Sequence, residues 1–420
     1  MIFVATLLYR LALNLYRTGV QVAALLGNEK ARKWLSGRRH WQQSLQHALD
    51  RLPKGPRIWL HAASLGEFEQ GRPVLEQLQK EAPDCQVILT FFSPSGYEQQ
   101  KHFQQAAIVA YLPLDNPANA RRFLEMVQPQ AALFVKYEFW YFFLKTLQER
   151  RIPTLLFSAA FRQEQPFFKW YGGLFRKMLS WYDALQVQDR KSLFLLQQLS
   201  PALPVVLGGD TRYDRVAAIA ARLKEIETAA LFKGKSRLLV AGSTWPADEA
   251  LLRYWLDQRP ADWKLILAPH EIDAPHLAAI EKQFDGQTVR FSQFSPDSKQ
   301  PVLIIDNIGL LSSLYRYGDV AFIGGGFARS GIHNVLEPAV YGIPVLMGPH
   351  YRKFSEAVQL VENGFAVPVE NKDAFLAAFT QLAGQSAALK PEIKSFMATQ
   401  TGATSLVMQW IRGKVKDLMQ

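Results

Sequence analysis

Three charged side chains in the first half of the sequence stand where acid–base or anion-binding chemistry is possible. Glu67, Glu138 and Arg212 each lie at or just after the end of an apolar run typical of a buried strand. Ligands of parallel α/β sheets bind at the carboxyl ends of strands, so these positions favour a ligand site. A glutamate there can take a proton from an attacking hydroxyl, and arginine binds phosphate or carboxylate through its forked guanidinium.

The same pattern allows a purely structural interpretation of each residue. Ser64 and Glu67 have the Ser-x-x-Glu spacing of a capping box, in which the glutamate bonds to the backbone at a helix start. Glu138 could equally be the partner of a helix cap, and Arg212 could lie on the surface at the start of a helix. Both interpretations stay open at this level.

Glycines and polar residues follow the strand-like runs of the second half. Gly309 would let the backbone approach a planar base, and the glycines at 324–326 would let it approach a ligand at a strand end. Asn334 and Glu337 project from the next predicted helix, where a glutamate could accept two hydrogen bonds from a ribose diol. This predicts a nucleotide site. The P-loop and Gly-x-Gly-x-x-Gly patterns are absent, which disfavours NTP hydrolysis and dinucleotide oxidation.

Two other strand ends leave the choice between ligand and structure open. In the stretch 241–249, backbone N–H groups could hold a phosphate, or Ser243 or Thr244 could cap the following helix. His270, after Pro269, could hydrogen-bond a ligand or cap a loop.

To position these residues, parallel strands must end at one edge of a sheet. From Arg57 onward, short apolar runs alternate with helical patterns, which predicts parallel sheets with helices on both faces. The predicted strands are 58–64, 86–92, 108–113, 131–137, 153–160, 184–188, 205–208, 237–243, 264–270, 288–292, 301–307, 319–325, 343–348 and 365–369.

A length of 420 residues and two similar sets of strands predict two Rossmann-like domains. We place these domains at 36–209 and 236–392, with a polar helical linker at 210–235 between them. A helix is expected at 1–35 and another at 393–420.

The first 60 residues carry ten basic and two acidic residues, most of the net charge of +11. Their longest charge-free stretch, 18–28, is shorter than the ~18–20 residues that span a bilayer. Arg10, Asn14, Arg17 and Gln21 form one polar stripe on an otherwise apolar helix. This pattern is typical of a helix lying in an anionic membrane interface, although a helix packed on the protein's own core remains an alternative.

Metal and disulfide chemistry find little support in the sequence. The single cysteine, Cys85, excludes an intramolecular disulfide and a Cys-rich zinc site. The eight histidines form no metal-binding motif, so we expect no metal.

Taken in order, five motifs resemble the 3-deoxy-D-manno-octulosonic acid (Kdo) transferases. They read AASLGEFEQGRP, GDTRYDRV, AGSTW, DNIGLL and GGGFARSGIHNVLEPAVYGIPVLMGP, and the similarity spans essentially the whole chain. The resemblance implies a GT-B fold, with two Rossmann-like domains, a cleft between them and a C-terminal helix packing back on the first domain. It implies inverting, metal-independent and cofactor-free transfer of Kdo from CMP-Kdo to the lipid A precursor. This would occur at the cytoplasmic face of the inner membrane of a Gram-negative bacterium.

The resemblance also assigns roles to residues at matching positions. Glu67 corresponds to the proton acceptor, and Glu138 and Arg212 correspond to transition-state stabilisers. The implied CMP contacts are Pro269, His270, Ile308, Gly309, Leu310, Asn334, Val335, Leu336 and Glu337.

Two positions depart from the family pattern. His270 stands where many members have an arginine able to neutralise donor phosphate, so its charge depends on pH. Leu310 stands where members often have glutamate, so a contact there would be through backbone.

Two rival functions remain open. Another GT-B enzyme with a UDP-sugar donor would share the fold and the helix glutamate. A non-catalytic polyanion-binding protein would use the basic N-terminus and show salt-dependent nucleic-acid binding.

Overall fold

The computed structural model describes residues 2–222 and 225–415. The chain forms two compact units, one ending at Asp214 and rejoined by the segment from Gln400 onward, the other Arg215–Thr399. The division falls inside a helix of the predicted linker. Of the predicted segments, 1–35, 210–235 and 393–420 include residues 1, 223–224 and 416–420, which lie outside the described part.

The first unit is built on a parallel sheet in the order β3-β2-β1-β4-β5-β6-β7. Its strands are β1 Arg57–Ala62, β2 Gln86–Phe91, β3 Ile108–Tyr111, β4 Ala131–Val135, β5 Thr154–Ala159, β6 Ala184–Val187 and β7 Val205–Leu207. Because helices cover both faces, strands β2, β4 and β5 are buried along their whole length. Burial on both faces explains why these strands read as unbroken apolar runs.

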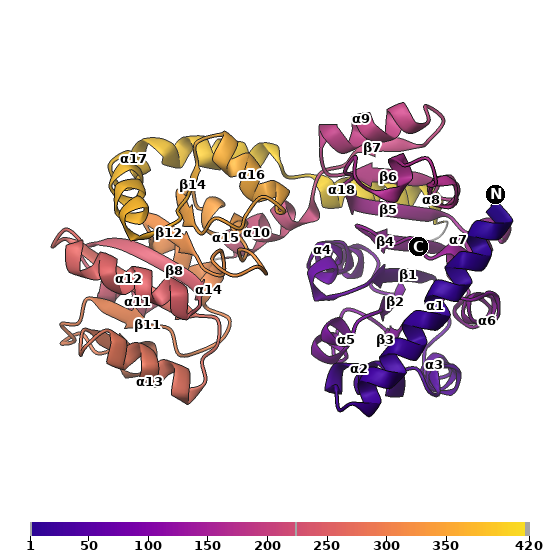
Figure 1. Ribbon diagram of the computed structural model, residues 1–420, viewed down its shortest axis with the longest axis horizontal. Coiled ribbons are helices and arrows are strands. Elements are labelled where there is room, and N and C mark those ends of the chain that lie inside the picture. Colours follow the sequence, from indigo (N-terminus) through magenta and orange to yellow (C-terminus); the bar gives the residue numbers. More distant parts are fainter. Residues whose placement is uncertain (1, 223–224, 416–420) are drawn as a thin grey trace. The chain divides into compact units, whose positions relative to one another are not determined.

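The helices of the first unit pack on the two faces of this sheet (Figure 1). One core joins the sheet to α3, α6, α7 and α8, and the other joins it to α4 and α18. The α-helices of this unit are α1 Ile2–Leu25, α2 Glu29–Ser36, α3 Trp41–Leu49, α4 Leu65–Glu81, α5 Pro94–Gln100, α6 Pro117–Val127, α7 Tyr141–Glu149, α8 Gly173–Leu179, α9 Arg190–Leu199, α10 Thr211–Ala221 (which runs on into the second unit) and α18 Ala403–Lys414, with a 3-10 turn η1 at Pro166–Phe168.

The second unit repeats the design with the order β10-β11-β9-β8-β12-β13-β14, also parallel. Its strands are β8 Arg237–Thr244, β9 Trp263–Pro269, β10 Thr288–Arg290, β11 Val302–Ile304, β12 Val320–Ile323, β13 Val345–Met347 and β14 Ala366–Pro368. Its helices are α11 Glu227–Lys233, α12 Pro246–Gln258, α13 Ala274–Gln283, α14 Leu311–Leu314, α15 Leu336–Ala339, α16 Ser355–Glu362 and α17 Lys372–Thr399, with 3-10 turns η2 Phe291–Gln293 and η3 Tyr315–Tyr317. The predicted α/β fold is confirmed, and every predicted strand is present with ends shifted by a few residues.

Each sheet has a point where the strand order reverses. In the first unit β1 and β4 are neighbours, although β2 and β3 lie between them in sequence. In the second unit β8 and β12 are neighbours in the same way. Loops leave such a pair in opposite directions and open a crevice at the carboxyl ends, which is where ligands of these sheets bind.

The N-terminal segment is two helices rather than one. Helix α1 ends at Leu25, Gly27 has φ +94°, and the side chain of Asn28 caps α2. A left-handed residue ends a helix, and glycine adopts that conformation at least cost, so the break follows from the sequence.

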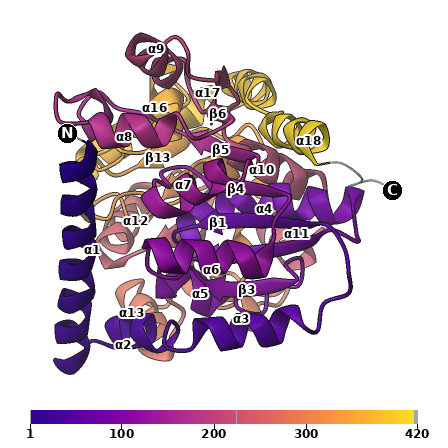
Figure 2. The same ribbon diagram turned by 90° about the vertical axis from the view of Figure 1, so that its right-hand side faces the viewer.

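Helix α1 is docked on the first unit by one narrow face (Figure 2). Ala5 and Tyr9 pack against the core, and the Tyr9 hydroxyl donates a 2.6 Å hydrogen bond to the buried Asp115 carboxylate. Burial raises the pKa of Asp115 to about 6. The helix is therefore fixed to its unit while most of its surface is left exposed.

One of the ten basic residues of the N-terminal segment faces inward. The Arg38 guanidinium donates to the carbonyls of Trp34, Phe92 and Leu112, at 2.6–3.1 Å. Burial lowers the pKa of Arg38 to about 9. Arg38 therefore holds the N-terminal segment to the first unit. Its guanidinium is not part of the basic surface that the sequence suggested for binding polyanions.

The C-terminal end belongs to the first unit. Helix α18 contributes Val407, Met408 and Ile411 to the core that it shares with α4. The Asp214 carboxylate accepts hydrogen bonds from the backbone of Gly402 and Thr404, both at 2.6 Å, and so caps α18. Residues 393–399 of the predicted C-terminal segment are the last turns of α17 in the second unit.

Candidate active site

Glu67 lies in the first turn of α4, directly after β1 at the switch point of the first sheet. The Ser64 hydroxyl donates to Oε2 of Glu67. Ser64 accepts no capping bond from the helix backbone, so this end of α4 lacks the reciprocal bonds of a capping box. The contact runs between two side chains instead. It leaves the half-buried carboxylate at the helix N-terminus, where the helix dipole favours negative charge.

Glu138 follows β4, the neighbour of β1, and is 3% exposed. Its Oε2 lies 3.0 Å from Nε2 of His61 and accepts a 2.5 Å hydrogen bond from the Trp140 indole. Trp59 donates to the Thr90 hydroxyl, which lies 2.8 Å from Nδ1 of His61. Nδ1 of His61 also lies 3.0 Å from the Thr90 carbonyl oxygen. The Glu138 carboxylate is therefore held by the Trp140 indole and lies within ion-pair distance of the His61 ring.

Arg212 opens α10 after β7 and is held by the buried Asp210. Its Nε and Nη2 lie 2.9 and 2.6 Å from Oδ2 of that carboxylate. The Gln70 and Gln188 amides also donate to Asp210, at 3.3 and 3.0 Å. This network orients the guanidinium and explains the sequence Gly-Asp-Thr-Arg-Tyr-Asp, in which Asp210 positions Arg212 and Asp214 caps α18.

The structure brings these three predicted residues to one edge of the first sheet. Gln70, one turn after Glu67 on α4, contacts the carboxylate that holds Arg212. Burial raises the pKa of the Tyr137 phenol, which is next to Glu138. The charge of Glu67 raises this pKa further, and the charge of Arg212 lowers it. Sequence reasoning missed Tyr137. Its signal was its place beside Glu138 at the end of a strand.

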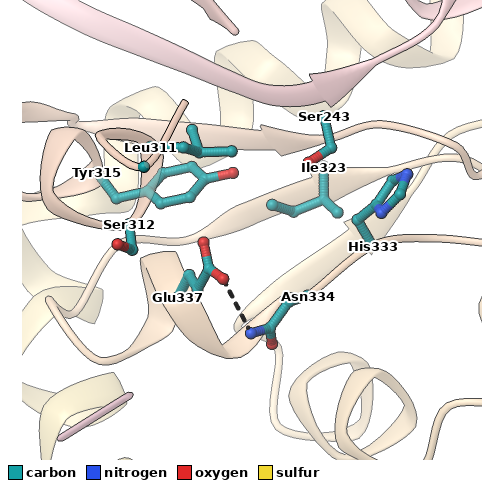
Figure 3. A pocket seen from close by; sticks show the side chains of 9 residues that line it. Ser243, Leu311, Ser312, Tyr315, Ile323, His333, Asn334 and Glu337 are labelled. Carbon is teal, nitrogen blue, oxygen red and sulfur yellow. Dashed lines mark hydrogen bonds between the residues drawn. The ribbon is translucent and has the colours of Figure 1, made fainter. Parts of the chain in front are cut away.

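A cavity of about 280 Å³ lies at the switch point of the second sheet (Figure 3). It is lined by Ser243, Gly309, Leu311, Ser312, Tyr315, Ile323, His333, Asn334 and Glu337. Three of the nine predicted CMP contacts, Gly309, Asn334 and Glu337, therefore lie in one cavity. Gly309 has φ +96°, a conformation that any other residue would adopt only with strain.

Glu337 is the acidic residue of this cavity. The Asn334 amide donates a 3.2 Å hydrogen bond to its Oε1, as Figure 3 shows. Burial raises the pKa of Glu337, and the Asn334 bond and the Arg215 charge oppose that rise. A desolvated carboxylate held by an amide is suited to accept hydrogen bonds from neutral hydroxyl groups. Sequence reasoning assigned no role to Arg215.

Three rings stack beside this cavity. The His270 ring stacks on Trp245, with ring centroids 4.7 Å apart, and on His333, with centroids 4.5 Å apart. The Trp245 indole lies 3.3 Å from Nε2 of His333. Burial and the neighbouring His270 lower the pKa of His333 to about 4, so His333 is neutral at pH 7. At the position of the family arginine, this chain has an exposed histidine in a ring stack.

The glycines at 324–326 serve packing within the unit. A Cβ on Gly324 would lie 2.2 Å from the Ser243 carbonyl oxygen, and one on Gly326 would lie 2.6 Å from the Gly348 nitrogen. The Gly325 N–H donates to the buried Asp248 carboxylate. The space that a side chain on Gly324 or Gly326 would take is therefore filled by neighbouring backbone, which explains why these positions need glycine.

The helix after β8 is capped in an unexpected way. Neither Ser243 nor Thr244 is the N-cap; Trp245 is, with Asp248 accepting from its backbone nitrogen at 2.9 Å. Ser243 instead has φ +54° and lines the cavity. A strained non-glycine residue at a ligand cavity is a common feature of functional sites.

The other predicted CMP residues are spread around this edge. Ile308 is 88% exposed, whereas the side chains of Val335 and Leu336 are fully buried and could offer only backbone. Pro269 ends β9, and Leu310 is the N-cap of α14. Neither of the latter two lines the cavity.

Several known proteins are similar to this chain. Residues 39–215 match the family described as "3-Deoxy-D-manno-octulosonic-acid transferase (kdotransferase)". A 3-deoxy-D-manno-octulosonic acid transferase from Aquifex aeolicus is 29% identical over 80% of this chain and 89% of that protein. Proteins of the same name from Haemophilus influenzae and Bordetella pertussis are 29% and 28% identical, over 74% and 84% of this chain and 74% and 86% of their own lengths.

Solved structures support the fold. A UDP-GlcNAc 2-epimerase from Neisseria meningitidis matches 84% of this chain and 98% of its own, with a TM-score of 0.58 and 16% identity. MurG from Acinetobacter baumannii matches 86% of this chain and 100% of its own, with a TM-score of 0.56 and 13% identity. At such identities the likeness concerns the GT-B architecture alone.

Proposed function

Because residues 39–215 match the 3-deoxy-D-manno-octulosonic acid transferase model and transferases of that name are 28–29% identical to most of this chain, we propose that it is a glycosyltransferase that moves Kdo from CMP-Kdo to the lipid A precursor (lipid IVA) in lipopolysaccharide biosynthesis. The observation that carries this proposal is the family match over 39–215. That region holds Glu67, Glu138 and Arg212 at one edge of one sheet.

The proposed chemistry uses the charged edge of the first unit. An acceptor hydroxyl attacks the anomeric carbon of Kdo, the bond to the CMP phosphate breaks, and Glu67 takes the hydroxyl proton. A single displacement of this kind inverts the anomeric centre. Arg212, oriented by Asp210, would stabilise negative charge on the phosphate or the Kdo carboxylate. Glu138, held by Trp140 and close to His61, would stabilise positive charge that develops on the sugar.

The second unit is proposed to bind the CMP moiety. The Glu337 carboxylate would accept hydrogen bonds from the ribose hydroxyls, and the backbone at Gly309 would approach the base. His270 would lie near the donor phosphate in place of the family arginine. Its contribution would depend on pH.

Helix α1 is proposed to lie on the anionic cytoplasmic surface of the inner membrane. Beside the Ala5–Tyr9 docking face it exposes Leu8, Leu11 and Leu15, each at least 53% exposed. Exposed leucines at helical spacing next to Arg10 and Arg17 favour the headgroup region of an anionic bilayer. Among the described residues, no helix reaches the length and hydropathy needed to cross a bilayer.

A direct transfer assay tests the proposal. The protein is incubated with CMP-Kdo and tetra-acylated lipid A precursor, and the products are resolved by mass. We expect the acceptor to gain the mass of one or more Kdo residues, with equal rates in EDTA because the proposed mechanism uses no metal or cofactor. A folded protein that binds CMP but transfers nothing would contradict the acceptor assignment.

Ligand competition separates the rivals. CMP should protect the protein against thermal unfolding while UDP does not; the reverse order would favour a UDP-sugar enzyme. Strong, salt-dependent binding of RNA without transfer would favour the polyanion-binding alternative.

A further inference from the structure

Two large aromatic side chains stand exposed on the segment between β5 and α8. Trp170 is 92% exposed and Tyr171 is 56% exposed, with ring centroids 5.6 Å apart and planes at 88°. Among the described residues, Trp170 is the most exposed of the large hydrophobic side chains. Adjacent exposed aromatic rings are costly in water and mark a binding surface.

The base of this segment is firmly held. Phe167, three residues before Trp170, is 3% exposed and belongs to the core of the first unit. The Arg176 guanidinium donates to the carbonyls of Phe167 and Lys169, both at 2.9 Å. A Cβ on Gly172 would lie 2.0 Å from the Pro166 carbonyl oxygen, so the turn needs glycine. The turn that carries the two rings therefore has a fixed conformation.

The exposed rings adjoin the surface already assigned to the membrane. Helix α8, which begins directly after them, contacts α1, and Figure 2 shows the preceding loop beside the N-terminal turns of α1. Residues 161–180 carry four basic residues and one acidic residue. Aromatic rings with basic neighbours, on a loop beside a helix that exposes leucines, match the chemistry of an anionic lipid headgroup layer.

We propose that Trp170 and Tyr171 form a second membrane anchor, which binds the headgroup region of an anionic bilayer together with α1. The inference rests on the proposed membrane association of α1. One helix in an interface leaves the protein free to roll about the helix axis, whereas a second contact fixes the face of the unit turned to the lipid. Trp and Tyr rings are suited to this layer because one end is apolar and the other is polar.

Site-specific fluorescence tests this proposal in the full-length protein. Cys85 is 2% exposed, so a cysteine placed on the surface can be labelled selectively with an environment-sensitive dye. We compare Trp170→Cys with Leu11→Cys on α1 and with the control Phe194→Cys on α9, a position that is 58% exposed. Each is titrated with vesicles of phosphatidylethanolamine and phosphatidylglycerol, and with neutral phosphatidylcholine vesicles.

The dyes at 170 and 11 should shift to the blue on the anionic vesicles, and the dye at 194 should not. In unlabelled protein, Trp170→Ala should weaken vesicle binding about tenfold, as expected for a partly buried ring. A response at 11 without one at 170 would overturn the second anchor and leave the role of α1 standing. No response at either position would overturn both. A shift at 170 that grows with protein concentration and needs no vesicles would assign the rings to a second copy of the chain.

Discussion

The two units place their candidate sites at equivalent points of similar sheets but build them from different chemistry. At the β1/β4 edge, the Glu138 carboxylate and the Arg212 guanidinium are held by fixed partners, Trp140 and Asp210. At the β8/β12 edge, the cavity beside Glu337 has neutral rings and an amide around one desolvated carboxylate. Preorganised charge suits bond making, whereas a neutral, desolvated cavity suits recognition of a nucleoside.

This contrast teaches that one topology can serve two tasks. The switch point supplies the crevice in both units, and the residues at the strand ends decide its use. Variants in the first unit should therefore alter the rate of transfer, and variants in the second should alter CMP affinity.

The largest effect is expected for Glu67→Ala. Loss of the proton acceptor should lower the transfer rate about 10²–10⁴-fold, because positioned base catalysis contributes that much. CMP affinity should be unchanged, since the CMP contacts are assigned to the second unit. The matched control is Glu76→Ala on the same helix, which loses only a surface pair with Arg72. Full activity of Glu67→Ala would remove the proton-acceptor role.

Glu337→Gln tests whether the second unit determines CMP affinity. The change keeps the shape and the Asn334 contact but removes the charge-assisted bonds to ribose, so the Kd of CMP should rise about 10–100-fold. Calorimetry of CMP binding measures it. At saturating donor, transfer should remain near the wild-type rate. Glu362→Gln, at an exposed position on α16, serves as the control. A fall in kcat with unchanged CMP affinity would place Glu337 in the chemical step.

His61 should act as a positioning residue for Glu138. In His61→Ala the Glu138 carboxylate loses the ring nitrogen 3.0 Å away, and kcat should fall about tenfold, as expected for the loss of one close polar contact. The KM for CMP-Kdo should stay constant. His61→Gln, which can still donate a hydrogen bond, should recover part of the rate. Equal loss in both variants, in proportion to lost stability, would indicate a merely structural role.

The smallest effect concerns stability near His333. Its pKa is about 4 in the folded protein, below the usual 6.5. Between these two pH values the unfolded chain binds a proton at His333 that the folded chain does not. The contribution of His333 to stability is therefore present at high pH and is lost as the pH falls from 6.5 to 4. Between pH 6.5 and 4, the free energy of unfolding of His333→Gln should therefore fall by about 1–3 kcal/mol less than that of the wild type.

Urea unfolding at several pH values measures this difference. Asp115 and Asp248, whose pKa values burial raises to about 6, titrate in the opposite sense but are present in both proteins. If the stability of wild type and of His333→Gln changed with pH in the same way, the pKa of His333 would not be lowered in the folded protein.

Much of the fold could be predicted because strands buried on both faces must be apolar throughout. The break after α1 was missed, because one helix was expected over 1–35, although Gly27 is a residue type that commonly ends helices. The hydrogen-bond partners of individual site residues could not be predicted as well from the sequence. Ser64 and Glu67 have the spacing of a capping box, yet their side chains contact each other. His61 was missed because it lies inside an apolar run, where its one signal is that a buried polar ring needs partners.

The sequence by itself determined the alternation of strands and helices, the glycine needed at Gly309, the positions of Glu67 and Glu138 after strand ends, and the place of Glu337 on a helix, because these depend on local pattern. Only the tertiary structure decided that β1 pairs with β4, so that His61 reaches Glu138, and that Asp210 holds Arg212. It also decided that the glycines at 324–326 face backbone. Such contacts join residues far apart in the chain, and they arise from strand register and close packing, which local sequence does not encode.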